Sequence, residues 1–181
     1  MLDSKRTPIA LSVLALIVFG YFGWVYTKIR TADHLVLIAL EVSDRLNSVE
    51  RYLAKNELKR KIEKGDFDSA LVLHDLLAVS FPGQSDPNAA AVELADELLA
   101  GSIDVNTRGL MGLTALHMSI IANDVCAVEY LLSRGANKSL TIQVGDDPTD
   151  KLDALGYVHF VDQLLPGKDR TEIANLLRDD T

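Results

Sequence analysis

Cysteine is almost absent from this chain of 181 residues, since Cys126 is the only one. A single cysteine excludes an internal disulfide, and no cysteine stands beside the apolar N-terminal stretch to carry a lipid. Phosphate-binding loops and nucleophile elbows are also lacking, and no histidine stands near enough in sequence to Cys126 to complete a metal motif. We therefore expect no catalytic residues, no metal site and no cofactor.

Charged residues are absent from residues 7–27, which read TPIALSVLALIVFGYFGWVYT. A helix of about 20 apolar residues spans roughly 30 Å, the thickness of the hydrocarbon core of a membrane. Basic residues flank both ends of this run, and aromatic residues gather near its second end. The pattern predicts a transmembrane helix within an N-terminal anchor over residues 1–30, and the missing cleavage site predicts that it stays attached.

The orientation of this predicted helix rests on the short basic tail that precedes it. Such a tail before a first apolar helix is usually retained in the cytoplasm, although the basic charge on the two sides is nearly equal here. We therefore expect a single-pass protein of the plasma or inner membrane, with its soluble part on the non-cytoplasmic side.

Charge is divided unevenly along the chain. Residues 1–64 hold 11 Lys and Arg against 7 Asp and Glu, whereas residues 65–181 hold 7 against 19. A strongly acidic part is repelled by phosphate backbones, which argues against nucleic acid and favours a basic or neutral partner. The acidic surface is equally consistent with solubility alone.

Residues 31–65 have the pattern of an amphipathic helical linker. Apolar residues recur at spacings of three and four from Leu35 to Leu53, which is the period of one apolar helix face. The expected helix runs from Ala32 to Lys64. Its apolar stripe would suit a coiled coil between two copies, and thus a homo-oligomer, or packing on another subunit or on the chain's own domain.

The most informative stretch begins at Gly112 and reads GLTALHMSIIANDVCAVEYLLSRGANKS. Thr114 is the expected N-cap of a first helix and Asp124 that of a second, with Leu116 buried between them. Gly135 follows the second helix, at a position that often requires a positive φ. Two short antiparallel helices cannot bury their own faces, so this unit needs neighbours.

These residues resemble the ankyrin repeat, whose pattern is a glycine, then Thr-Pro-Leu-His, two helices, and a closing Gly-Ala-Asp. The matching positions hold Gly112, Thr114, Leu116, His117 and Gly135, with alanine in place of the proline. The resemblance implies one clear repeat over residues 109–141 within a short ankyrin-like domain over residues 66–181. The predicted fold class is all-α: a single transmembrane helix, a linker helix and an ankyrin-like helical repeat stack.

The flanking repeats are degenerate. Upstream, helices capped by Asp66 and Asp86 are expected to form an atypical terminal repeat. Downstream, a helix is expected to begin at Asp147, an insertion to occupy residues 157–167, and a last helix to follow Asp169. Three units are about the minimum that can fold as a stack.

Partner-binding residues follow from the resemblance, because in ankyrin stacks the turn tips and the inner face of the first helices contact partners. The implied residues are Leu110, Met111, Leu113, Ile121, Ala122 and Arg134. Loop tips are normally polar, so the apolar segment 110–113 is expected to be an exposed interface. The alternative is that the linker helix or the C-terminal insertion covers this segment.

The function that the resemblance implies is protein–protein interaction. We expect a membrane-anchored adaptor or accessory subunit that binds another protein through its ankyrin-like face. The alternative is an inhibitor or immunity protein that neutralises a toxin or enzyme, and an enzyme is the third hypothesis. The resemblance gives His117 a structural role between adjacent repeats, and no set of residues supplies both a nucleophile and its base.

Overall fold

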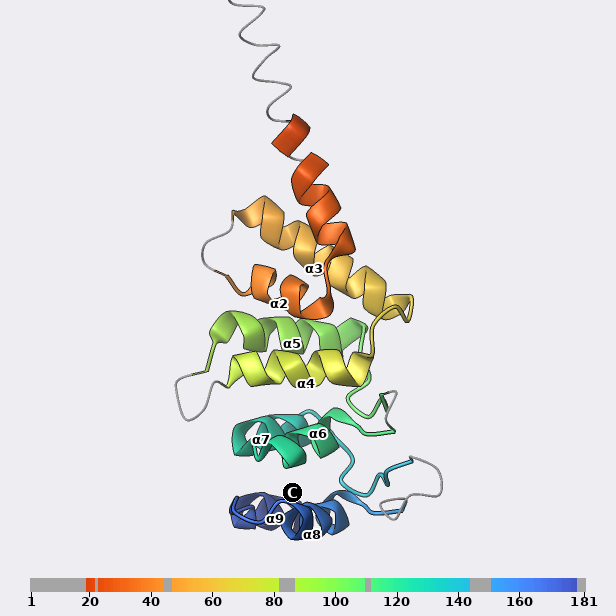
Figure 1. Ribbon diagram of the computed structural model, residues 1–181, viewed down its shortest axis with the longest axis vertical. Helices are drawn as coiled ribbons and strands as arrows, with labels where there is room; N and C mark the ends of the chain where they lie inside the picture. The colour runs from red at the N-terminus through yellow and green to blue at the C-terminus, as the bar shows by residue number, and fades with distance from the viewer. Residues whose placement is uncertain are drawn as a thin grey trace, which may run out of the picture. The chain divides into compact units, whose positions relative to one another are not determined.

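The computed structural model describes residues 19–21, 23–43, 47–81, 87–109, 112–143 and 151–178. All regular secondary structure within these ranges is helical, which confirms the all-α class for the described residues (Figure 1). The chain divides into two compact units, Met1–Leu58 and Lys59–Thr181. The boundary falls within helix α3, which covers Ser48–Glu63.

In the first unit, a helical segment covers residues 23–31 and helix α2 covers His34–Glu41. Asp33 caps α2, because its carboxylate accepts a hydrogen bond from the Leu35 backbone N–H. The Tyr21 hydroxyl donates to the Glu50 carboxylate on α3, which is buried. This hydrogen bond joins two segments of the first unit.

The single helix predicted from Ala32 to Lys64 is wrong, because α2 and α3 are separate helices. Helix α2 ends at Glu41, with Val42 as its C-cap, and α3 begins after Asn47. The Asn47 side-chain oxygen accepts from the backbone N–H groups of Val49 and Glu50 at 3.0 Å each. A cap of this kind satisfies the free donors at a helix start, so Asn47 begins a new helix.

The single-pass membrane location expected from residues 7–27 is corrected by the structure. Among the residues described, no helix is long and apolar enough to cross a membrane. The helical residues 23–31 carry Lys28 and Arg30, and a span requires about 20 apolar residues. Residues 7–18 and 22 of the expected span lie outside the described residues.

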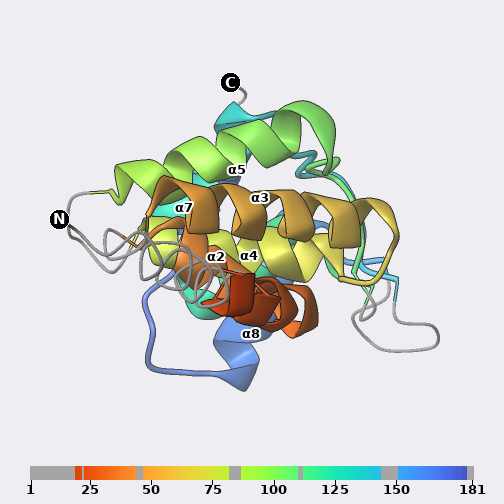
Figure 2. The same ribbon diagram turned by 90° about the horizontal axis from the view of Figure 1, so that it is seen from above.

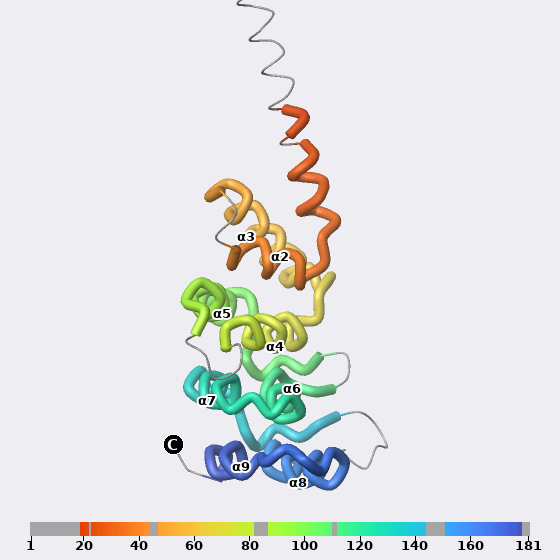
Figure 3. Tube along the Cα trace, turned by 60° about the vertical axis from the view of Figure 1, so that its left-hand side comes forward, coloured from red at the N-terminus to blue at the C-terminus, as the bar shows by residue number. Residues whose placement is uncertain are grey.

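The second unit is a stack of helix pairs (Figures 1 and 3). The pairs are α4 Ser69–Ser80 with α5 Ala89–Gly101, α6 Ala115–Ala122 with α7 Val125–Ser133, and α8 Ala154–Leu164 with α9 Thr171–Arg178. The first helices α4, α6 and α8 contact one another in order, and α7 contacts α9. Seen from above, α4 and α5 run beside each other (Figure 2). The arrangement is consistent with the expected ankyrin-like stack.

Polar side chains start the helices of this unit. Thr114 caps α6 and Asp124 caps α7, as predicted. The predicted cap of α4 is displaced by two residues, since Asp68 rather than Asp66 accepts from the first N–H groups of that helix. Asp66 belongs to the turn that ends α3, where its backbone N–H donates to the Lys61 carbonyl at 2.9 Å.

The cap of α5 and the third pair also differ from expectation. Asn88 caps α5, whereas Asp86 lies outside the described residues. The segment expected as an insertion, 157–167, contains most of α8, whose cap is Asp153. The third pair differs from the second by a longer connection before its first helix, α8. The expected helix start at Asp147 falls outside the described residues.

Leu116 is buried inside the stack with 1% of its surface exposed. Replacement by alanine removes this contact and leaves a cavity, so we expect the free energy of unfolding to fall by about 2 to 5 kcal/mol. Urea unfolding followed by circular dichroism measures the change. Leu71→Ala is the control, because Leu71 is 38% exposed and its loss should cost far less. Equal losses in the two variants would contradict the placement of Leu116.

Candidate protein-interaction site

Gly112 joins the loop before α6 to the loop after α7. Its φ is +69°, and an added Cβ would lie 2.0 Å from the carbonyl oxygen of Gln143. The Gln143 N–H donates to the Gly112 carbonyl at 3.4 Å. Only glycine allows this close approach, which explains why a glycine opens the repeat.

The loops of successive repeats are also joined by polar contacts. The Asn106 side-chain oxygen accepts from the Asn137 backbone N–H at 2.7 Å. The Arg108 guanidinium donates twice to the Thr141 carbonyl, at 2.9 and 3.3 Å. These partners stand 31 and 33 residues apart, close to one repeat length. The contacts fix the spacing between adjacent loops.

Gly135 ends α7 with φ of +85°, as predicted. Its N–H donates to the Leu132 carbonyl at 3.0 Å, and the Ala136 N–H donates to the Leu131 carbonyl at 2.9 Å. This pair of hydrogen bonds satisfies carbonyls at the helix end and turns the chain toward the next loop.

His117 is buried, with 1% of its surface exposed. Its Nδ1 accepts from the Thr114 backbone N–H at 3.3 Å, and its ring meets that of Tyr157 on α8 edge-on at 5.5 Å. Burial, and then the Arg108 charge, lower the pKa of His117 to about 4. The ring is therefore neutral at pH 7 and packs α6 against α8.

The predicted partner-binding residues lie in different settings. Leu110 and Met111 are outside the described residues. Leu113 is buried with 8% exposure, which agrees for this residue with the alternative that the segment is covered. Ile121 is half-buried and Ala122 is exposed, both in the last turn of α6.

The remaining predicted contact residue, Arg134, pairs with Asp96. Its Nη2 and Nε donate to Asp96 Oδ1 at 2.6 and 2.8 Å, and its guanidinium lies over the Tyr130 ring at 4.9 Å. The Tyr130 hydroxyl donates to the same oxygen at 2.6 Å. That hydrogen bond, followed by the contacts with Arg134, lowers the pKa of Asp96. The cluster ties α5 to α7.

Ala122 lines a groove of about 710 Å³, which we call the acidic groove. The groove lies where the end of α4, the turn between α6 and α7, and the starts of α7 and α9 come together. Its lining residues are Ala78, Phe81, Ala122, Asn123, Asp124, Val125, Cys126, Glu129, Asp169 and Glu172. Four of them are acidic and none is basic. The groove therefore presents negative charge around a partly apolar floor.

Arg170 fastens the start of α9 to the end of α6. This side chain is buried, with 1% of its surface exposed. Its Nε donates to the Ile120 carbonyl at 3.1 Å, its Nη2 to the Ile121 carbonyl at 3.3 Å, and its Nη1 to Asp162 at 3.1 Å. Carbonyls at a helix end lack intrahelical donors, and a cation there is favoured.

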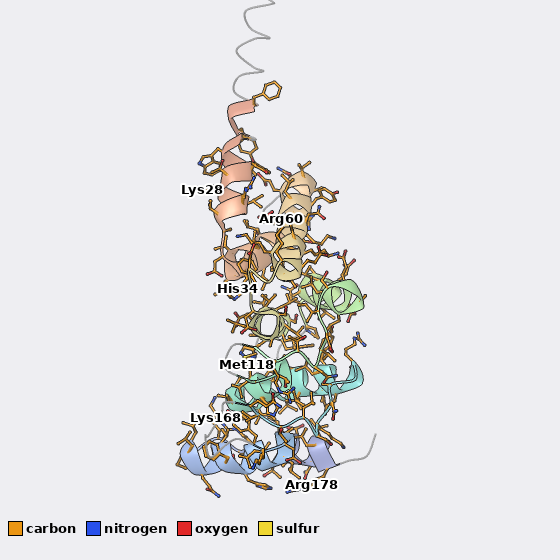
Figure 4. The ribbon with its side chains drawn as sticks, turned by 90° about the vertical axis from the view of Figure 1, so that its right-hand side faces the viewer. Lys28, His34, Arg60, Met118, Lys168 and Arg178 are labelled. Carbon is orange, nitrogen blue, oxygen red and sulfur yellow. The ribbon has the colours of Figure 1, made fainter. Side chains whose placement is uncertain are left out.

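Lys168 adds an exposed contact at the same helix end. Its Nζ donates to the Ala122 carbonyl at 3.2 Å, and the side chain can be followed in Figure 4. Sequence reasoning placed a helix start at Asp169 but missed both cations. The carbonyls on α6 that accept from them are 46 to 50 residues away along the chain, so no local pattern reveals these contacts.

The chemistry available to the groove is limited. Burial, followed by the charges of Asp124, Glu129 and Glu172, raises the pKa of the Cys126 thiol, which disfavours the reactive thiolate. In the described ranges, no group of three or more His, Cys, Asp and Glu side chains is placed to hold a metal ion.

Comparison with known proteins identifies one segment of the chain. No curated protein and no solved structure matches it. A family model does match: residues 111–142 correspond to the ankyrin repeat, and the match spans α6 and α7 with their adjoining loops. Ankyrin repeats are in general interaction modules without enzymatic activity. Residues 111–142 thus match the ankyrin repeat, which in general serves as a protein–protein interaction module.

Proposed function

We propose that the second unit binds one partner protein, as an adaptor or accessory subunit, through the surface around the acidic groove. The observation that carries this proposal is an open groove of about 710 Å³ beside the ankyrin repeat. Two of the predicted contact residues, Ile121 and Ala122, stand in the helix turn that borders it. The proposal therefore places the partner at the helix turns of the stack.

The groove is held in shape by its own contacts, which supports a binding role. Arg170 joins the wall formed by α9 to the carboxyl end of α6. The Phe81 ring on its floor packs against the Tyr130 ring, with centroids 5.8 Å apart. A preformed surface loses little conformational entropy when a partner binds.

An inhibitor or immunity protein is the second candidate, favoured by the acidic lining. Such a protein would cover a basic active site or a basic contact surface of a toxin or enzyme. The two candidates differ in consequence, because an inhibitor abolishes the activity of its partner, whereas an adaptor leaves that activity intact. An activity assay of the purified partner, with and without this chain, separates them.

The test is capture of a partner followed by reconstitution with purified components. We expect Ala122→Arg to weaken the complex by about tenfold or more, because the new side chain fills the groove. Ala100→Arg is the matched control, since Ala100 is also an exposed alanine near the end of a helix and lies away from the groove. Thermal melting should be unchanged in both variants. Failure of the full chain to bind any protein partner would refute the function, and equal affinities of the two variants would refute this surface.

A further inference from the structure

We infer that the acidic groove receives an extended basic segment of the partner protein, with an apolar side chain between its basic ones. This inference rests on the proposed function and adds the chemistry of the partner. It depends on two properties of the groove, an apolar floor and a rim of carboxylates, which come from different elements of the stack.

The floor offers a place for an apolar side chain. Ala78 and Phe81 come from the end of α4, Ala122 from the end of α6, and Val125 from the first turn of α7. All four retain exposed surface, although Phe81 also packs against Tyr130. An apolar residue, or the methylene stem of a lysine or arginine, gains by covering such a surface.

The rim holds four carboxylates, and only two of them accept hydrogen bonds at the start of a helix. Asp124 caps α7, and Asp169 accepts from the Thr171 N–H at the start of α9, so these two carboxylates have a local structural role. Glu129 stands in the middle of α7 and has no capping role. Glu172 lies in the first turn of α9 and is exposed. Burial is the main cause of the raised pKa of Cys126, and the charges of Asp124, Glu129 and Glu172 raise it further.

The charge of the groove indicates which kind of molecule binds in it. Four of the residues that line the groove are acidic and none is basic, while Lys168 donates to the carbonyl of Ala122 at its border. The excess negative charge attracts cations and repels phosphate, so a nucleic acid or an acidic peptide is disfavoured. Arginine is particularly suited, because its guanidinium binds carboxylates through two parallel hydrogen bonds and its stem packs on apolar surface.

The probe is a fluorescein-labelled peptide in which arginine and leucine alternate, titrated with the full chain and followed by fluorescence anisotropy. A control peptide has glutamine at each arginine position. We expect the arginine peptide to bind at least about tenfold more tightly than the control. Raising the salt from about 0.1 M to about 1 M should remove most of that difference, because the Debye length falls from about 10 to 3 Å.

Two double variants with the same change in net charge locate the binding. Glu129→Gln with Glu172→Gln should weaken binding of the arginine peptide by about tenfold or more. Glu63→Gln with Glu93→Gln should not, because both side chains are exposed and lie outside the groove. Melting temperatures of both variants report whether the fold is intact.

Three outcomes would overturn the inference. The first is equal weakening by the two double variants, which means that general surface charge attracts the peptide. The second is binding that the groove variant leaves unchanged while Ala122→Arg still disrupts the captured partner, which preserves the proposed function without a basic occupant. The third is a concentration-dependent mass of the full chain in sedimentation that the groove variant abolishes, which means that a second copy occupies the groove.

Discussion

Replacement of Arg170 by methionine is expected to lower the free energy of unfolding by about 3 to 5 kcal/mol, because a buried, charged donor is lost. Methionine keeps an unbranched apolar stem but donates to none of the three acceptors. The Ile120 and Ile121 carbonyls would lose hydrogen bonds of 3.1 and 3.3 Å from the guanidinium. Asp162 contributes less to this loss, since 41% of its side chain is exposed to water.

Urea unfolding measures this loss, and two further variants test its cause. Lys168→Met also removes a cation at the end of α6, but that side chain is exposed, so a change below about 1 kcal/mol is expected. Arg170→Lys keeps the charge and loses the planar fork, so its stability should fall between those of the wild type and Arg170→Met. The same small loss in Arg170→Met and Lys168→Met would show that Arg170 does not join the two repeats.

The parts of the fold that sequence reasoning predicted depend on short-range physics. Thr114 and Asp124 cap their helices by accepting from N–H groups within three residues. Gly135 takes a positive φ because the helix end itself demands it. Such features are visible in a few consecutive residues, and the central repeat consists largely of them.

The parts that sequence reasoning missed depend on contacts between distant residues. The acidic groove combines Glu129 with Glu172, which are separated by a loop, a whole helix and a turn. The uneven charge of the chain predicts an acidic surface but does not show where its carboxylates gather. The burial of Arg170 also depends on distant residues. An arginine beside a helix start is usually solvated, and nothing nearby in the sequence indicates that this one is buried.

The predicted helix boundaries were wrong where two signals in the sequence disagreed. The apolar period from Leu35 to Leu53 continues through the break between α2 and α3, so periodicity alone predicts one helix. The Asn47 side chain overrides it, because its oxygen accepts from the first backbone N–H groups of a new helix. In the third repeat, α8 begins after Asp153. The loop before α8 is longer than the loop before α6, so a fixed repeat length predicts the wrong start for this helix.

The stability of the second unit is expected to fall as the pH drops from about 6.5 to 4, because His117 remains neutral when folded. Its pKa is lowered from 6.5 to about 4, so across this range the unfolded chain binds a proton that the folded chain does not. Burial is the main cause and the Arg108 charge the second, while the Leu140 carbonyl and Asp153 act in the opposite direction. A shift of this size corresponds to roughly 3 kcal/mol.

The variant His117→Gln isolates this contribution, since glutamine does not titrate and its amide oxygen can accept from the Thr114 N–H. Urea unfolding at a series of pH values should show a steep loss of stability below pH 6.5 in the wild type and a shallower one in His117→Gln. Carboxylates such as Asp96, whose lowered pKa also costs stability in acid, contribute equally to both proteins and cancel in the difference. His159→Gln is the control, because His159 is exposed, and it should keep the wild-type pH dependence. Parallel curves for the wild type and His117→Gln would mean that the pKa of His117 is the same in the folded and unfolded chain. That result would contradict its burial between α6 and α8.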